Sequence, residues 1–247
     1  MSRRSGGSSS GSGKGRRERP AIEVSDLVKH YGDVVALEVD ELEVPQGQSV
    51  VLVGHNGSGK STLLNILAGT LEASEGRVRV EGEPPDSMVA RAGRSWLPDN
   101  PVLYDDLSVR EHLEYTSRMH GGDGEEPLLG ELVERLGLAG REDDLPSQFS
   151  RGLRQKTAVA IALCRPFSIL LVDEPFVGLD TSGRAAFLEL LAQARDEGAT
   201  IVVATHDPAV IEQFERGIVL DNGEVIHDGP ASELPAFLSA DAAHHER

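Results

Sequence analysis

The stretch Val50-Val51-Leu52-Val53-Gly54-His55-Asn56-Gly57-Ser58-Gly59-Lys60-Ser61-Thr62 decides how the rest of the chain is interpreted. Four apolar residues, enough for a short strand, lead into a glycine-rich turn. The turn opens into Leu63–Ala68, whose apolar residues have helical spacing. A strand, a GxxxxGK[ST] turn and a helix in this order form a P-loop, which holds a chain of phosphates.

The residue types of the turn fit phosphate binding. Glycine can take positive φ and can approach a phosphate without a Cβ in the way. The backbone N–H groups form a nest for an anion, and the N-terminus of the following helix adds about half a positive charge. We expect Lys60 to contact the β- and γ-phosphates and Ser61 to be an oxygen ligand of Mg²⁺. The nucleotide-binding residues predicted in the turn are Gly54, His55, Asn56, Gly57, Ser58, Gly59, Lys60, Ser61 and Thr62. A plain Gly/Ser turn with an incidental lysine is the alternative, and the flanking strand and helix argue against it.

The composition limits the protein class. At 247 residues the chain suits one large α/β domain with an inserted subdomain. No apolar run approaches the roughly 18–20 residues of a membrane helix, and the N-terminus lacks the apolar segment of a secretory signal. The single cysteine, Cys164, excludes an internal disulfide and favours a reducing cytosol. It lies in an apolar run with helical spacing, so we expect it in the core rather than as a nucleophile.

The charge is strongly acidic but uneven. The net charge is −17, yet residues 1–20 hold six basic residues and only one acidic residue. An acidic body disfavours nucleic acid as a partner. The first 20 residues are mainly Ser, Gly and Arg, so we expect a disordered tail. This tail is either simply solvated or rests on anionic lipid, which attracts each basic residue by about 1 kcal/mol. Residues 239–247 are expected to be a flexible C-terminal tail.

A second motif supplies carboxylates. The apolar run Ile169–Val172 ends in Asp173-Glu174-Pro175. Such a run predicts a buried parallel strand that presents its acidic residues at the ligand-binding edge of the sheet. With a P-loop upstream, Asp173 is predicted to hold Mg²⁺, through water, and Glu174 to be the general base for the attacking water. Two solvated carboxylates at the end of a strand are the plainer alternative.

Strand and helix patterns alternate along the chain, which predicts an α/β fold with a P-loop NTPase core. We expect a mainly parallel sheet with helices on both faces, antiparallel strands at its edge and a helical insertion at about residues 100–160. Further strands are predicted at Ala21–Leu27 (an edge strand), Val34–Val44, Arg77–Glu81, Thr200–Ala204, Arg216–Asp221 and Glu224–His227. Helices are predicted at Val109–Met119, Leu128–Leu136 and Thr181–Glu197. A further long helix is predicted to open at Phe149–Lys156 and to continue through Ala158–Leu163. Residues 84–94 give no clear pattern.

Together these motifs resemble the ATP-binding subunit of ABC (ATP-binding cassette) transporters over about residues 21–230, within a domain expected at 21–238. By this resemblance, Gly54–Thr62 is the Walker A loop, and Asp173 and Glu174 are the Walker B aspartate and the catalytic glutamate. Tyr31 matches the aromatic residue that stacks on adenine. Two further matches are Asp180 in the D-loop Gly178-Leu179-Asp180 and His206, the switch histidine that contacts the γ-phosphate.

Two positions depart from the family pattern. The family signature is LSGGQ, whereas this chain has Phe149-Ser150-Arg151-Gly152-Leu153. Ser150 and Gly152 keep the hydroxyl and backbone N–H that, by resemblance, reach ATP bound by an opposite subunit. The run 150–156 looks like the variant found in ABC-2 type exporters. Asp99 replaces the Q-loop glutamine, and as a hard oxygen ligand it is still predicted to contact Mg²⁺.

The resemblance also implies partners and a location. It predicts a head-to-tail dimer, homo- or heteromeric, with two ATP molecules at the interface. It predicts a separate integral membrane permease that docks around Asp99–Leu113, with the chain peripheral on the cytoplasmic face of the membrane. Two alternatives stay open at this point: a soluble ABC ATPase that acts in assembly, such as iron–sulfur cluster loading, and a nucleic-acid-linked ABC protein. The acidic body disfavours the second of these.

Overall fold

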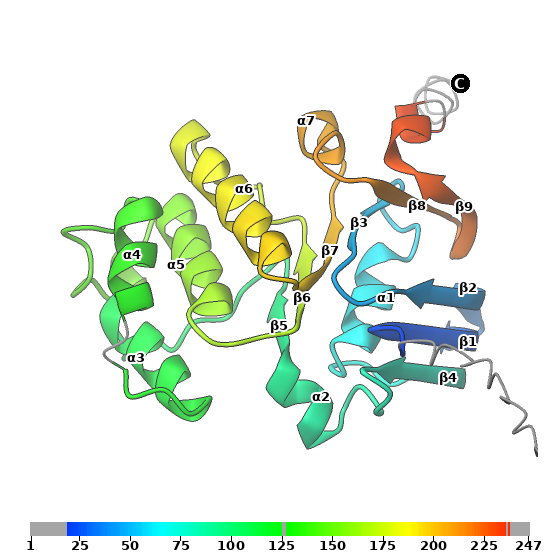
Figure 1. Ribbon diagram of the computed structural model, residues 1–247, viewed down its shortest axis with the longest axis horizontal. Helices are drawn as coiled ribbons and strands as arrows, with labels where there is room; N and C mark the ends of the chain where they lie inside the picture. Colours follow the sequence, from blue (N-terminus) through cyan, green and yellow to red (C-terminus); the bar gives the residue numbers. More distant parts are fainter. Residues whose placement is uncertain (1–18, 125–126, 236, 238–247) are drawn as a thin grey trace, which may run out of the picture.

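The computed structural model describes residues 19–124, 127–235 and 237 (Figure 1). The tails predicted at residues 1–20 and 239–247 therefore lie almost wholly outside the described residues. The strands are β1 (Ile22–Tyr31), β2 (Val34–Val44), β3 (Ser49–Val53), β4 (Glu75–Val80), β5 (Arg94–Leu97), β6 (Ile169–Asp173), β7 (Thr200–Ala204), β8 (Arg216–Asp221) and β9 (Glu224–Pro230). The helices are α1 (Lys60–Leu67), α2 (Met88–Gly93), α3 (Val109–Met119), α4 (Pro127–Arg135), α5 (Arg151–Leu163), α6 (Thr181–Asp196) and α7 (Pro208–Ile211), with 3-10 turns at Pro146–Gln148 and Ala231–Glu233.

The strands form one mixed sheet in the order β4-β1-β2-β9-β8-β3-β7-β6-β5. From β5 to β8 the neighbours are parallel. The β8–β9 hairpin is antiparallel, as are the pairs β1–β2 and β1–β4, whereas β2 and β9 pair in parallel at Glu38 and Glu224. The predicted parallel core with antiparallel edge strands is confirmed.

One strand was placed wrongly by its sequence pattern. The weak alternation of Ala21–Leu27 predicted an edge strand, but β1 is hydrogen-bonded on both sides, to β2 and to β4. The edge strand of this end of the sheet is β4. The alternation reports only which face of a strand is buried, here Ile22, Val24 and Leu27, and not whether a further strand pairs with its backbone.

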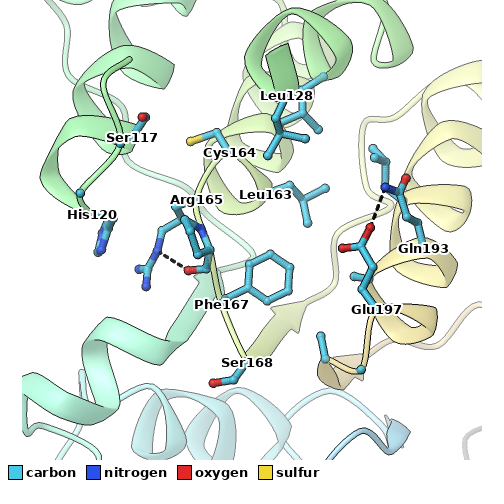
Figure 2. Close-up of a pocket in the computed structure, with 18 residues that line it drawn as sticks. Ser117, His120, Leu128, Leu163, Cys164, Arg165, Phe167, Ser168, Gln193 and Glu197 are labelled. Atoms are coloured by element: carbon cyan, nitrogen blue, oxygen red, sulfur yellow. Dashed lines mark hydrogen bonds between the residues drawn. The ribbon is translucent and has the colours of Figure 1, made fainter. Parts of the chain in front are cut away.

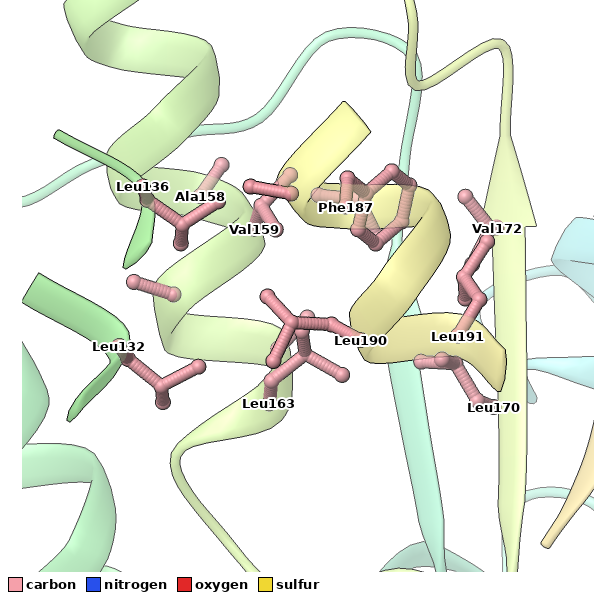
Figure 3. Close-up of a cluster of buried hydrophobic side chains, with 14 of the residues drawn as sticks. Leu132, Leu136, Ala158, Val159, Leu163, Leu170, Val172, Phe187, Leu190 and Leu191 are labelled. Carbon is pink, nitrogen blue, oxygen red and sulfur yellow. The ribbon is translucent and has the colours of Figure 1, made fainter. Parts of the chain in front are cut away.

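The parallel strands are buried on both faces, because successive side chains point to opposite sides of a sheet. In β6, Ile169 and Leu171 join the cluster that contains the α1 residues Leu63 and Leu67. The intervening residue Leu170 belongs instead to the cluster that contains residues of α5 and α6, and Figure 3 shows it beside Leu191 of α6. Helices on both faces therefore hold β6, the strand that ends in Asp173, in a fixed position.

Helices α3, α4 and α5, which we call the three-helix segment, lie on the side of the sheet away from β1, β2 and β4 (Figure 1). A capping box is present at the start of α3: Glu111 N–H donates to Ser108 Oγ (3.3 Å), and Ser108 N–H donates to Glu111 Oε2 (2.8 Å). Cys164 is buried in the core, as predicted. Residues 88–93, which gave no pattern, form α2, capped by Ser87 Oγ accepting from Ala90 N–H (3.1 Å).

Within the described ranges, none of the helices has both the length and the apolar character needed to cross a bilayer.

Candidate functional site

The glycine-rich turn is packed against two neighbouring strands, and this requires glycine at two positions. Gly54 has φ +151°, and a Cβ there would lie 2.1 Å from the carbonyl oxygen of Leu220 in β8. Gly59 has φ +103°, and its Cβ would lie 3.0 Å from Leu37 Cδ1 in β2. A side chain at either position would collide with the sheet as well as strain the backbone.

The β8–β9 hairpin clamps the same turn. Gly223 N–H donates to Ser58 O (3.1 Å), and Glu38 N–H in β2 donates to Gly223 O (2.7 Å). The His55 ring nitrogen Nε2 lies 2.8 Å from Asp221 Oδ1 at the end of β8. The turn is therefore held by elements that are more than 150 residues further along the chain.

Lys60 is the first residue of α1, directly after the turn, and is only 7% exposed. Its Nζ donates hydrogen bonds to Gly54 O (2.7 Å) and His55 O (3.1 Å). Burial lowers the pKa of Lys60, and the nearby carboxylates Glu174 and Asp173 oppose this shift. A buried ammonium group is thus aimed along the turn, with two carboxylates nearby.

A cavity of about 360 Å³, which we call the P-loop cavity, opens beside this lysine. Its lining comes from segments far apart in the sequence that meet at the carboxyl ends of the parallel strands, where ligands bind in α/β sheets. The lining residues are Ala36, Asn56, Gly57, Gly59, Lys60, Ser61, Thr62, Asp99, Glu174, Val177 and His206. Nine of these were predicted as site residues, so the structure brings most of the predicted nucleotide site together.

Asp173 lies behind Ser61 and is 2% exposed. Burial raises the pKa of Asp173, a hydrogen bond from Ser61 opposes the rise, and the neighbouring carboxylates Glu174 and Asp99 add to it. Among the described residues, Asp173 Oδ1 has no hydrogen-bond partner. A buried, unpartnered carboxylate oxygen beside a hydroxyl and other acidic groups is a donor set that fits a hard divalent cation such as Mg²⁺.

Glu174 and His206 meet across the P-loop cavity. His206 Nδ1 lies 3.0 Å from Glu174 Oε2, and the glutamate side chain is 18% exposed whereas the histidine side chain is 72% exposed. Glu174 has φ +43°, a strained conformation for a residue with a side chain, and its N–H donates to Ala204 O of β7 (2.9 Å). The turn that starts at Glu174 thus directs its carboxylate into the cavity next to the ring of His206.

The predicted signature and D-loop residues line a different cavity, of about 460 Å³, which we call the signature cavity. Ser150 is the N-cap of α5, its Oγ accepting from Leu153 N–H (3.1 Å). Asp180 is the N-cap of α6 and also accepts from Lys156 Nζ (2.9 Å). The lining residues are Gly137, Arg141, Gln148, Ser150, Gly152, Leu153, Lys156, Gly178 and Asp180. No P-loop residue is among them, so the predicted site residues fall into two separate groups, which we call half-sites.

Some predicted residues lie away from both cavities. Tyr31, at the end of β1, is 53% exposed and does not line the P-loop cavity; the ammonium group of Lys29 lies 5.3 Å from its ring centroid. Gly54, His55 and Ser58 do not line the cavity. They lie on the side of the turn that packs against the sheet, where Gly54 approaches Leu220 and His55 contacts Asp221. Ser58 is fully buried, and its Oγ has no hydrogen-bond partner among the described residues.

Four charged residues near the half-sites were missed from the sequence. They are Asp221 and Lys156, whose contacts are given above, and the ion pair of Arg184 with Asp207. Asp207 follows His206 directly, which was a usable signal. The other contacts join segments at least 23 residues apart, so no local pattern could have predicted them.

A larger cavity, of about 690 Å³, lies between the three-helix segment and the C-terminal end of α6 (Figure 2). Figure 2 shows apolar side chains such as Leu163 and Phe167 beside it, with Arg165 on one side. The buried Arg165 donates to the backbone carbonyls of Arg91 and Ala92, so its positive charge caps the C-terminal end of α2. This cavity holds none of the predicted site residues.

Comparison with known proteins gives one consistent result. The family model described as ABC transporter matches residues 37–177, more than half of the chain. The ABC-type transporter ATP-binding protein EcsA of Bacillus subtilis (strain 168) is 33% identical over 230 residues, covering 90% of this chain and 92% of EcsA. The macrolide export ATP-binding/permease protein MacB 1 of Aeromonas hydrophila subsp. hydrophila is 35% identical over 240 residues; the chain spans only 37% of the length of this relative.

Solved structures agree. An ATP-binding subunit of an ABC transporter superposes with a TM-score of 0.79 at 28% identity, covering 92% of this chain and 98% of that one. A dimeric ATP-binding cassette in a post-hydrolysis state bound to ADP and Pi gives a TM-score of 0.78 at 27% identity, covering 85% and 98%. The described residues thus have the fold of an ATP-binding cassette, and the chain belongs to the ABC transporter family.

Proposed function

We propose that this chain binds Mg-ATP in the P-loop cavity, hydrolyses it, and uses the cycle to drive export through a membrane permease. The observation that carries the proposal is the convergence of Lys60, Glu174 and His206 on one cavity. The lysine supplies a buried positive charge, and the glutamate and histidine supply a paired base and hydrogen-bond donor. Phosphoryl transfer to water needs little more than this positioning and electrostatic stabilisation.

Each residue has a defined part in the reaction. Lys60 exchanges its two carbonyl contacts for the β- and γ-phosphate oxygens, which are better partners for an ammonium group. Glu174 orients the attacking water and accepts its proton. His206 lies 3.0 Å from the glutamate carboxylate and donates to the γ-phosphate when ATP is bound. Tyr31, exposed at the end of β1, is available to stack on adenine.

The same cavity has the ligands for Mg²⁺. Ser61 and Asp99 line it, and Asp173 with its unpartnered Oδ1 lies directly behind Ser61. When bound, Mg²⁺ supplies positive charge to the β- and γ-phosphate oxygens. The three residues of this chain would hold it, Asp173 through water.

The separation of the two cavities supports action as a dimer. Ser150, Gly152 and Asp180 line the signature cavity, and none of them reaches the P-loop of the same chain. A second cassette in head-to-tail orientation would place its own signature cavity over this P-loop and complete the site. The solved relatives include a dimeric cassette, which supports this arrangement.

Exposed apolar side chains favour a docking surface for a membrane permease next to the P-loop cavity. Val102, Tyr104, Tyr115 and Met119 are between 45% and 95% exposed, and the rings of Tyr104 and Tyr115 meet edge to face at 5.7 Å. Large apolar residues gathered on a surface mark a site of protein interaction. They belong to α3 and to the segment that begins at Asp99, so a docked partner would be connected directly to a predicted Mg²⁺ ligand. Co-purification tests this part: we expect a polytopic membrane protein, and recovery of only a soluble partner would contradict it.

The direction of transport is inferred from two observations. The relative MacB 1 carries macrolide export in its name, and the run 150–156 resembles the ABC-2 exporter variant of the signature. Both observations support export.

Substitution of the proposed base tests the reaction. Glu174→Gln keeps the shape of the side chain and its contact with His206 but cannot accept a proton. We expect ATP binding to be unchanged, hydrolysis to fall by about 10²-fold or more, and ATP-bound dimers to accumulate in size-exclusion chromatography. An undiminished rate of phosphate release from this variant would rule out Glu174 as the base.

A further inference from the structure

We propose that Arg184 is a positioning residue of the ATPase site: it holds Asp207, and through it the switch histidine His206, in reach of Glu174. The proposal rests on the roles proposed above for Glu174 and His206. It adds a residue that touches neither of them, but touches a close neighbour of each.

Arg184 lies in the first turn of α6, and its guanidinium makes two contacts. It forms an ion pair with the carboxylate of Asp207, the residue that follows His206. Its Cζ also lies 5.3 Å from the ring centroid of Phe176, two residues after Glu174. A planar guanidinium can pair with a carboxylate and stack on an aromatic ring at the same time, which an ammonium group does less well. One cation thus connects the segments that carry both members of the Glu–His pair.

His206 needs such support because its side chain is held so weakly. The ring is 72% exposed, and among the described residues the Glu174 carboxylate is its only polar partner. Its position is therefore set by the backbone on either side. Asp207 fixes that backbone: its N–H donates to Thr205 Oγ1 (3.2 Å), and its Oδ1 accepts from Ala209 N–H (3.0 Å) as the N-cap of α7.

The Arg184–Asp207 pair is well suited to this task. The side chains are 34% and 23% exposed, so water screens them less than it screens a surface pair. The arginine holds Oδ2 of Asp207 while the cap occupies Oδ1, so both carboxylate oxygens have fixed partners. The Arg184 interaction also lowers the pKa of Asp207, so the pair is charged throughout the neutral range.

The same turn of α6 reaches the signature cavity. Asp180, the N-cap of α6, accepts from Lys156 Nζ (2.9 Å) in α5, and Arg184 lies one turn further along. Asp180 O also accepts the Arg184 N–H (2.9 Å). A shift of the D-loop on the signature side would therefore move Arg184 and the switch segment on the P-loop side. The first turn of α6 is a direct physical connection between the two half-sites of one chain.

The test uses the full chain with four single variants and one double variant. Arg184→Ala removes the cation. Asp207→Asn removes the negative charge but keeps a good N-cap residue for α7, so a loss of rate in this variant is not explained by a lost helix cap. Arg184→Lys keeps the charge without the planar fork. Arg195→Ala is the matched control, because Arg195 lies at the other end of α6 and, within the described part of the chain, its side chain pairs only with its exposed neighbour Asp196.

We expect Arg184→Ala and Asp207→Asn each to lower kcat for ATP hydrolysis about tenfold, with ATP affinity by calorimetry within about twofold of wild type. The double variant should be no slower than either single one, because both remove the same pair. Arg184→Lys should recover part of the rate, and Arg195→Ala should be normal.

Three outcomes would overturn the proposal: a normal kcat in Arg184→Ala, rate losses that multiply in the double variant, or a loss of rate that only follows a loss of folded protein in thermal melts. Failure of the base assignment is recognised separately, since it would appear as normal hydrolysis in Glu174→Gln whatever the Arg184 variants do.

Discussion

The P-loop cavity and the signature cavity are both lined by groups that favour an anion, but their charged side chains differ in how deeply they are buried. The first is built on the carboxyl ends of buried parallel strands, and its key charges, Lys60 and Asp173, are 7% and 2% exposed. The second lies at the N-termini of α5 and α6, where the Asp180 side chain is 60% exposed. Both surround their centre with helix N-termini and hydroxyl groups, which favour an anion.

This difference indicates how the two half-sites act. Buried charges without full pairing lower the stability of the fold, and they are typical of sites where a bound ligand supplies the missing partner. The P-loop cavity therefore has the character of a preorganised binding site. In the signature cavity the Lys156 side chain is also largely buried, at 12% exposed, but its charge is already paired with the exposed Asp180. We therefore expect the groups of this cavity to contribute when another molecule covers them. The following predictions test that contrast.

The largest effect is expected from Lys60→Ala. The substitution removes the one buried ammonium group of the P-loop cavity and leaves Gly54 O and His55 O without their donor. We expect ATP binding to fall below detection in calorimetry and hydrolysis to fall by about 10²- to 10³-fold. A lysine in the signature cavity should matter less: Lys156→Ala should keep ATP binding by the monomer. Equal losses of affinity in the two variants would remove the distinction between the half-sites.

A second pair of variants compares one glycine from each half-site. Gly54→Ala places a Cβ 2.1 Å from Leu220 O at φ +151°. The free energy of unfolding should therefore fall by at least about 1–3 kcal/mol. Gly152→Ala brings its Cβ to 2.9 Å from Gly178 O, at a half-buried position without positive φ, so the backbone at Gly178 must shift slightly. The variant should lose less stability in urea titrations than Gly54→Ala and should impair ATP-dependent dimerisation. If Gly152→Ala were the less stable of the two, the signature side would be the more rigid one.

Much of the P-loop half-site could be predicted from the sequence because its residues are consecutive or end a recognisable strand. The turn Gly54–Thr62 and the run ending in Asp173 and Glu174 are local patterns, and the cavity unites them as expected. The prediction of β1 as an edge strand failed for the opposite reason. Which strands pair with β1 is decided by β4, some 45 residues away, and nothing in residues 21–27 encodes it.

The supporting contacts could not be predicted at all. The pairs His55–Asp221, Lys156–Asp180 and Arg184–Asp207 join residues 166, 24 and 23 positions apart. His55 and Asp180 belong to recognisable motifs, but the residues that pair with them look in the sequence like ordinary charged residues on a polar surface. Only the fold shows that the partners meet, because their contact depends on how helices and strands are packed in three dimensions. The residues proposed to bind could be identified from motifs, whereas the residues that position them could not.

The smallest expected effect is a difference between the two half-sites in how the stability of the fold depends on pH. Folding lowers the pKa of Asp207, mainly through Arg184, and of Asp180, mainly through Lys156. The folded state then binds fewer protons than the unfolded state, in which an aspartate has a pKa near 3.8. Each pair therefore stabilises the fold fully above that value and loses its contribution as the pH falls through the lowered pKa.

Asp207→Asn and Asp180→Asn, measured by urea unfolding at several pH values, should both be less stable than wild type at neutral pH and approach it below about pH 3.8. The Asp207 variant should show the larger difference, because its side chain is 23% exposed and that of Asp180 is 60% exposed. Added salt should remove most of the Asp180 difference and leave most of the Asp207 difference, since screening acts chiefly on exposed pairs. Equal pH and salt responses would mean that both pairs are surface contacts. The ion pair on the P-loop side would then contribute no more to stability than the pair on the signature side.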